Sequence, residues 1–119
     1  MSSTYVFDND AFAQTEKKIN ELLDNAKDHF QEGEYKQAIT TYDQILEINP
    51  DSITALKMKG IALSNIDYHT KSLKQFFKVL QNNPKDPTAL SGMGLGFGNL
   101  GEYEESLFYF DKAYTEKPD

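Results

Sequence analysis

Apolar residues recur at intervals of three and four through most of this 119-residue chain, the spacing typical of amphipathic α-helices. The first such segment starts near Ala11. Because no glycine or proline follows before Gly33, it predicts one helix ending near Gln31. Five further helical segments follow, separated by turns at Glu32-Gly33, Ile66-Asp67 and Leu100-Gly101 and by the prolines at positions 50 and 84. The residue before a proline is pushed out of the helical conformation, so Asn49 and Asn83 are expected helix ends. The pattern predicts an all-α chain.

The segment from Gly33 to Pro50 returns almost feature for feature as Gly101 to Pro118, and a less regular copy runs from Asp67 to Pro84. The three prolines are 34 residues apart both times. A fixed period of this size indicates stacked repeats, in which each unit buries its apolar face against its neighbours. We therefore expect a right-handed α-solenoid of three helix-turn-helix units, residues 19–52, 53–86 and 87–119. Residues 1–18 are expected to form a lead-in and a helical extension. The first two turns of this helix, residues 11–18, are expected to shield the N-terminal end of the array.

Capping residues stand where the second and third units begin. Asp51 or Ser52 can cap the helix that follows Pro50, and Asp86 precedes a proline suited to the first helical position. The turn of the middle unit departs from the pattern, because Asp67 stands where the other units have glycine. That turn is expected to be looser.

Composition limits the kinds of partner. The net charge is −7, and all twelve basic residues are lysines. Without arginine the chain lacks the planar fork that holds phosphate or guanine through two hydrogen bonds, so nucleic acid is not an expected partner. It has no cysteine, no signal-peptide pattern at its N-terminus and no stretch of about 20 apolar residues. A cytoplasmic protein without membrane contact is the expectation by exclusion.

Aligned on the prolines, the units share small and aromatic residues at fixed positions. The small residues are Ala26, Gly60 and Gly94 in the first helices and Ala38, Ser72 and Ser106 in the second, and the aromatic ones are Tyr42, Phe76 and Phe110. This pattern, with its closing proline, resembles the tetratricopeptide repeat over residues 19–119. The tryptophan common in that family is replaced by Leu22, Leu56 and Leu90.

The resemblance implies a binding scaffold, not an enzyme, with the first helices lining a concave groove that holds a peptide segment of a partner protein. The positions it places there include Leu23, Lys27, Phe30, Lys57, Met58, Ile61, Asn65, Leu95 and Asn99, with Ser64, Thr88, Ser91 and Gly92 beside them. Several of these are apolar although the face should meet water, which favours an interaction site. We expect a ligand with apolar side chains and amide contacts from Asn65 and Asn99.

Some relatives hold the acidic tails of heat-shock chaperones through lysine, arginine and asparagine side chains. The corresponding positions here are Leu23, Lys27, Met58, Thr88 and Gly92. Only Lys27 has a suitable side chain, so this ligand is not expected.

The last unit suggests an alternative, self-assembly into a homo-oligomer. Phe108 and Tyr109 stand where the first unit has Thr40 and Thr41, so polar positions have become aromatic. A final repeat without a successor exposes the face that a successor would bury. Phe108, Tyr109 and Tyr114 are therefore expected to pack against another protomer, a strand-swapped neighbour or further repeats.

Other chemistry has little support. His29 and His69 lie in different units without a second ligand at metal-binding spacing, so no metal or cofactor is expected. No catalytic set is recognisable. The glycines at 92, 94, 96 and 98 lack the strand and lysine of a phosphate-binding loop. Each costs a helix ~1 kcal/mol relative to alanine, so either close helix packing or close approach of a ligand is expected to account for them.

Overall fold

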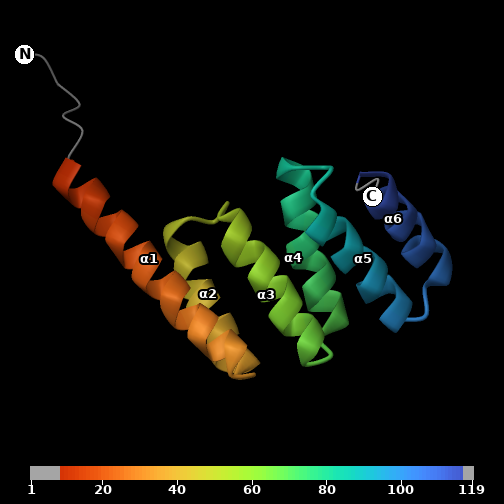
Figure 1. Ribbon diagram of the computed structural model, residues 1–119, viewed down its shortest axis with the longest axis horizontal. Helices are drawn as coiled ribbons and strands as arrows, with labels where there is room; N and C mark the ends of the chain where they lie inside the picture. Colours follow the sequence, from red (N-terminus) through yellow and green to blue (C-terminus); the bar gives the residue numbers. More distant parts are fainter. Residues whose placement is uncertain (1–8, 117–119) are drawn as a thin grey trace, which may run out of the picture.

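The computed structural model describes residues 9–116. This part of the chain forms six helices: α1 (Asn9–Gln31), α2 (Tyr35–Ile48), α3 (Ile53–Asn65), α4 (His69–Asn82), α5 (Pro87–Asn99) and α6 (Tyr103–Glu116). Each helix packs against the next, so three helix pairs stand side by side from α1 to α6 (Figure 1). The expected all-α arrangement is confirmed. Residues 1–8 of the predicted lead-in, and Pro118 of the repeat pattern, lie outside the described residues.

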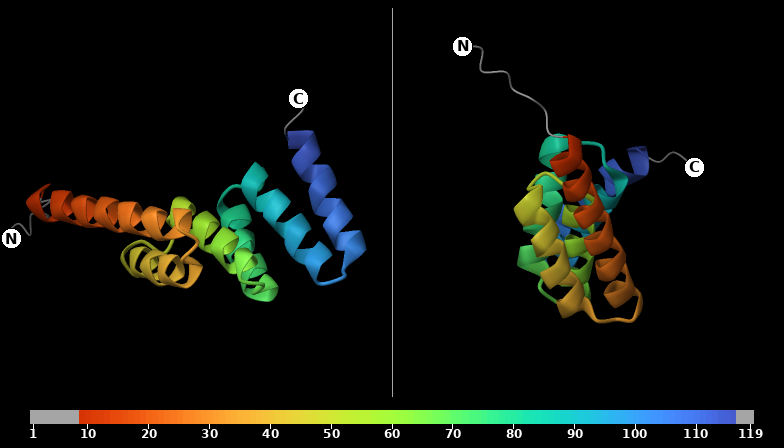
Figure 2. Two further views of the ribbon diagram at one scale, coloured as in Figure 1. Left: turned by 60° about the horizontal axis from the view of Figure 1, so that its bottom comes forward. Right: turned by 90° about the vertical axis from the view of Figure 1, so that its left-hand side faces the viewer.

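The helical extension does not shield the end of the array. Residues 9–18 are all exposed, and Figure 2 shows this part of α1 running on beyond α2. The expectation that residues 11–18 shield the N-terminal end of the array was therefore wrong. Phe12 is the only large apolar residue in this stretch and is 53% exposed, so these turns have no apolar stripe to bury against α2.

Small residues bring the two helices of each pair together. In the first pair the small residues are Ala26 and Ala38, which are both fully buried. In the second pair Ser72 Oγ donates a hydrogen bond of 2.7 Å to the carbonyl of Gly60. In the third pair Ser106 Oγ donates to the carbonyl of Gly94, also at 2.7 Å. The serines thus bond across the helix contact, and the repeated small positions of the sequence mark where the helices cross.

An aromatic ring fills the space between neighbouring pairs. Tyr42 and Phe76 are each 2% exposed. A Cβ added at Gly60 would lie 2.8 Å from Cζ of Phe76, and one added at Gly92 would lie 2.4 Å from its Cε2. The ring is therefore held between the backbones of α3 and α5. Phe110, at the same repeat position, is 42% exposed, because no described helix follows α6.

Helix packing accounts for the alternating glycines of α5. A side chain at these positions would collide with or crowd Phe76 (from Gly92), Phe110 (from Gly94), Leu73 (from Gly96) and Ser106 (from Gly98). These four side chains come from α4 and α6, the two helices that flank α5. Of the two explanations left open by the sequence, close packing is the one the geometry supports.

The three turns within the pairs have the same geometry. Gly33, Asp67 and Gly101 all have positive φ, at 77°, 65° and 82°. The amide of each donates to the carbonyl three residues earlier, at 3.0 to 3.1 Å. The middle turn is therefore not looser, contrary to expectation. Aspartate is among the few residues other than glycine that enter the left-handed region readily, so Asp67 replaces glycine without opening the turn.

Candidate binding groove

A hollow of about 400 Å³ lies between α3 and α5. Both are first helices of their pairs, and each contributes one residue of an equivalent pair, Ile61 and Leu95, which are 34 residues apart. The hollow is lined by Ile61, Ser64, Asn65, Phe76, Pro87, Thr88, Ser91, Gly92 and Leu95. Seven of these nine were placed on the concave face by the 34-residue period. We call this hollow the α3–α5 groove.

The groove combines apolar and uncharged polar groups. Leu95 is 49% exposed, and Ile61 is partly buried against the core of the second and third repeats. Asn65 donates from Nδ2 to the carbonyl of Ile61 at 2.9 Å, a bond that fixes its amide along the helix. None of the lining side chains is ionisable. The groove therefore offers apolar surface together with hydroxyl and amide groups, a combination suited to an uncharged ligand.

The other residues that the sequence placed in the groove lie outside this hollow. Leu23, Phe30 and Met58 pack against the core formed by α1, α2 and the start of α3. Phe30 also meets the ring of Tyr35 edge to face, with ring centroids 5.2 Å apart. These three apolar residues are partly buried, so less of their surface is exposed than the sequence suggested.

The remaining polar candidates do not border the hollow either. Lys27 and Asn99 are exposed on α1 and at the end of α5. Lys57 donates from Nζ to Oδ2 of Asp86 at 2.8 Å, and its side chain is only 27% exposed. The site brings together Ile61, Asn65 and Leu95 from the predicted set and leaves the other six elsewhere.

Two lining residues were not anticipated. Phe76 reaches the groove from α4, since its ring is buried between the two backbones that border the hollow. Pro87 begins α5 and lines the groove there. The sequence held a signal for Phe76, because Gly60 in the same repeat and Gly92 in the next one are small residues on the two helices that the ring contacts. The pattern by itself did not tell that the ring touches these two backbones.

The exposed apolar face of α6 differs from the one predicted. Tyr109 is half-buried, and its ring stacks on Phe97 with centroids 5.7 Å apart and planes 11° apart. Phe108 is 57% exposed, but it borders a small hollow beside Phe77 and Leu80 of α4. Tyr109 therefore does not share an exposed face with Tyr114, contrary to expectation, whereas Phe108 is exposed on the side of α6 that borders α4.

The terminal face is instead a stripe at four- and three-residue spacing along α6. Its members are Tyr103, Leu107, Phe110 and Tyr114, which are 74%, 62%, 42% and 79% exposed. We call it the α6 stripe. One repeat earlier the same positions are His69, Leu73, Phe76 and Leu80, of which the last three pack into the core shared with α5. The stripe is thus the surface that a following helix would cover.

The comparisons with known proteins agree with this architecture. A family described as "Psidin, N-terminal TPR repeats region" matches residues 16–119. The chain belongs to this family of tetratricopeptide repeat (TPR) regions. The predicted resemblance is thereby confirmed. A search of curated protein sequences found no match.

Several solved structures share the fold. The first TPR of Spaghetti (RPAP3), solved bound to the HSP90 peptide SRMEEVD, has a TM-score of 0.82 and 17% identity, covering 87% of this chain and 82% of that one. MamA from Desulfovibrio magneticus RS-1, residues 41 to the end, has a TM-score of 0.81 and 25% identity, covering 87% and 59%. The Sgt2 TPR domain from Aspergillus fumigatus has a TM-score of 0.79 and 23% identity, covering 85% and 67%. The chain thus spans less than three fifths of the MamA structure.

Two searches of the described residues bear on other functions. None of the helices between residues 9 and 116 is long and apolar enough to cross a membrane. Over the same range, no three His, Cys, Asp or Glu residues are grouped so that they could hold a metal ion. His29 Nδ1 lies 3.1 Å from Oε1 of Glu34 instead.

Proposed function

We propose that this chain is a non-enzymatic interaction module that binds a peptide segment of a partner protein in the α3–α5 groove. The observation that carries the proposal is the position of Leu95, a leucine 49% exposed beside a hollow without charged groups. Covering apolar surface stabilises a complex by ~25 cal/mol per Å² before the costs of association. Contiguous apolar surface of this kind is typical of binding sites.

The lining chemistry favours an uncharged segment with at least one apolar side chain. The apolar side chain would pack on Ile61 and Leu95, while the hydroxyl groups of Ser64, Thr88 and Ser91, which also line the groove, would bond its backbone. RPAP3 was solved with an HSP90 peptide that ends in two glutamates, a valine and an aspartate. The groove of this chain has no lysine among its lining residues, so we do not propose that ligand here.

The test uses peptides selected from a random library displayed on phage, with this chain immobilised. We expect selected peptides to contain an apolar residue and to bind in solution by fluorescence anisotropy. Leu95→Asp should weaken binding of such a peptide at least tenfold, because a carboxylate would replace the apolar contact. Since Leu95 is half-exposed, this change should leave the fold intact, as circular dichroism would verify.

The matched control is Leu100→Asp. Leu100 is 45% exposed, stands at the end of the same helix and does not line the groove. Equal weakening by both changes would indicate a general effect of charge, and unchanged binding by Leu95→Asp would remove the groove from the proposal.

A second function, self-association, is favoured by the α6 stripe. Its four side chains make one continuous apolar row, and each is exposed by more than two fifths. We propose that a second copy of the chain covers this row, because two apolar helix faces can bury one another symmetrically.

A further inference from the structure

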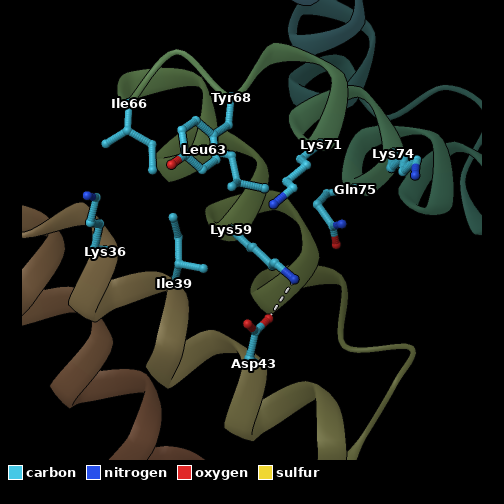
Figure 3. A pocket seen from close by; sticks show the side chains of 10 residues that line it. All are labelled: Lys36, Ile39, Asp43, Lys59, Leu63, Ile66, Tyr68, Lys71, Lys74 and Gln75. Atoms are coloured by element: carbon cyan, nitrogen blue, oxygen red, sulfur yellow. Dashed lines mark ion pairs between the residues drawn. The ribbon is translucent and has the colours of Figure 1, made fainter.

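A second hollow, of about 400 Å³, lies between α2 and α4 and differs from the groove in charge. It is lined by Lys36, Ile39 and Asp43 from α2, Lys59, Leu63 and Ile66 from α3 and its end, and Tyr68, Lys71, Lys74 and Gln75 from the start of α4 onward (Figure 3). We call it the lysine hollow. Its walls are an apolar group, Ile39, Leu63, Ile66 and Tyr68, and a basic group of four lysines.

The lysine hollow and the α3–α5 groove lie on opposite sides of α3. Lys59, Leu63 and Ile66 line the hollow, and Ile61, Ser64 and Asn65 line the groove. With 3.6 residues per turn, the mean directions of these two sets differ by about 180° around the helix. A ligand in the hollow would therefore leave the groove free.

The charge of the hollow is unusual for this protein. The chain has a net charge of −7, yet one third of its twelve lysines line this single site. Lys59 pairs with Asp43, with Nζ 2.6 Å from Oδ1. Among the described residues, Lys36, Lys71 and Lys74 have no such ion pair. Lys71 lies over the ring of Tyr68 at 5.3 Å, which holds its charge beside the apolar wall.

The repeat itself does not require these lysines. One period later, Lys36, Lys59, Lys71 and Lys74 are replaced by Thr70, Met93, Glu105 and Phe108. At the same spacing Gln75 is replaced by Tyr109, whose ring stacks on Phe97. A hollow also lies at the equivalent place one repeat later, but Thr70, Leu73, Phe77 and Met93 line it where Lys36, Ile39, Asp43 and Lys59 line the lysine hollow.

Gln75 adds a polar group that the protein leaves unsatisfied. The residue is 7% exposed, and its Oε1 is buried without a hydrogen-bond partner in the described part of the chain. Gln75 lines the hollow, so a ligand N–H that reaches this oxygen would satisfy it. A carboxylate or a fully ionised phosphate has no such donor, but a peptide backbone does.

We propose that the lysine hollow binds an acidic peptide segment that carries an apolar side chain. Lys36, Lys71 and Lys74 hold its carboxylates, Gln75 accepts from its backbone, and the apolar side chain packs on Ile39 and Tyr68. An inorganic anion would satisfy the lysines but would leave both the apolar wall and Gln75 uncovered.

The probe is the blocked peptide acetyl-Glu-Glu-Leu-Glu-Glu-amide, titrated into the ¹⁵N-labelled chain and followed by NMR. We expect saturable shifts of backbone amides of α2, of α4 and of the Lys59 side of α3, with affinity falling as salt rises. Shifts confined to the α3–α5 groove, or no saturable shifts at millimolar peptide, would overturn the proposal.

Two sets of variants locate the site. Gln75→Tyr introduces the ring that the chain itself uses one repeat later, and it should weaken peptide binding at least tenfold. If that variant fails to fold, the exposed pair Lys71→Gln with Lys74→Gln gives the same answer without changing the core. Lys78→Gln with Lys85→Gln, an equally exposed pair outside the hollow, is the control for total charge. Equal weakening by the two pairs would refute a defined site.

Two further ligands identify the chemistry. The same peptide with glutamine in place of every glutamate should bind at least tenfold more weakly, because its charges are gone. Inorganic phosphate should also bind at least tenfold more weakly than the acidic peptide. Shifts of the same amides by phosphate at equal affinity would assign the hollow to a free anion and overturn the peptide proposal.

Discussion

Lys57 Nζ of α3 lies 2.8 Å from Oδ2 of Asp86, the residue that caps α5. The other carboxylate oxygen of Asp86 accepts a hydrogen bond of 2.9 Å from the backbone N–H of Ala89. Burial by itself raises the pKa of Asp86, but the hydrogen bonds from Lys57 and Ala89 outweigh that effect and hold the pKa below its usual value. Lys57, which the sequence placed in the groove, thus joins the two helices that form the groove.

The lowered pKa makes this contact depend on pH. The unfolded chain binds the proton of Asp86 more tightly than the folded chain, so the carboxylate stabilises the fold fully above about pH 4 and loses this effect as pH falls through the folded pKa. Asp86→Asn should lower the free energy of unfolding by about 1–2 kcal/mol at pH 7, and much less at pH 3. Urea unfolding at both pH values checks this, and an equal loss at both would contradict it.

Lys57→Met provides the companion measurement. It removes the cation and leaves the Asp86 carboxylate bonded to Ala89. If Lys57 and Asp86 act as one unit, the double variant should lose less free energy of unfolding than the sum of the two single variants. The expected difference is about 1 kcal/mol. Strictly additive losses would show that Lys57 and Asp86 stabilise the fold independently.

Gly92 should be intolerant of a methyl group. A Cβ there would lie 2.4 Å from the Phe76 ring, which cannot move away because Gly60 confines its other side. Overpacking should exceed the gain in helix propensity, so we expect Gly92→Ala to lower the free energy of unfolding by about 1–2 kcal/mol.

Gly98→Ala is the matched control on the same helix. Its Cβ would lie 3.1 Å from Ser106 Oγ, a contact that a small shift can relieve. We expect its free energy of unfolding to stay within about 1 kcal/mol of the native value. If Gly98→Ala proved as costly as Gly92→Ala, the contact with Phe76 would not be the reason for glycine at position 92.

The left-handed turn at Asp67 offers a stabilising change. Asp67 has φ 65°, and the equivalent residues of the other two turns are glycines. Asp67→Gly should raise the free energy of unfolding by up to about 1 kcal/mol. The reciprocal change Gly33→Ala should lower it by about 1–2 kcal/mol, because no atom lies within 4 Å of the added Cβ and the penalty is purely conformational. Thermal unfolding of both variants measures this, and destabilisation by Asp67→Gly would contradict the account.

The α6 stripe predicts concentration-dependent self-association. Sedimentation equilibrium should show dimers of the native chain, and Leu107→Lys with Tyr114→Lys should leave only monomer. Phe108→Lys, which alters an exposed aromatic residue beside α4, should associate like the native chain. A native chain that stays monomeric at high concentration, or dimers that survive the double change, would exclude this surface.

Much of the fold could be predicted from the sequence because the 34-residue period fixes where helices begin and end. The predicted turns and the proline-linked ends agree with the six observed helices, and Ser52 and Asp86 cap α3 and α5 as expected. The period also gave the facing direction of Ile61, Asn65 and Leu95.

The period does not tell how closely neighbouring helices approach, and this limited the rest of the site. Leu23 and Met58 are partly buried against the core formed by α1, α2 and the start of α3, and neither lines the groove. The misplacement of Tyr109 on α6 has a different origin, because the change from a polar to an aromatic residue was taken to mean exposure. Tyr109 stacks its ring on Phe97 inside the array. The exposed residues of α6 are instead those of the α6 stripe, most of whose equivalents on α4 are covered by α5.

The central claim is that a peptide binds in the α3–α5 groove, and an NMR footprint tests it most directly. A phage-selected peptide is added to the ¹⁵N-labelled chain, and shifts of assigned backbone amides are recorded. The account predicts saturable shifts at Ile61, Asn65 and Leu95 that disappear in Leu95→Asp. Shifts that avoid these residues and fall on α6 or on the lysine hollow would contradict it.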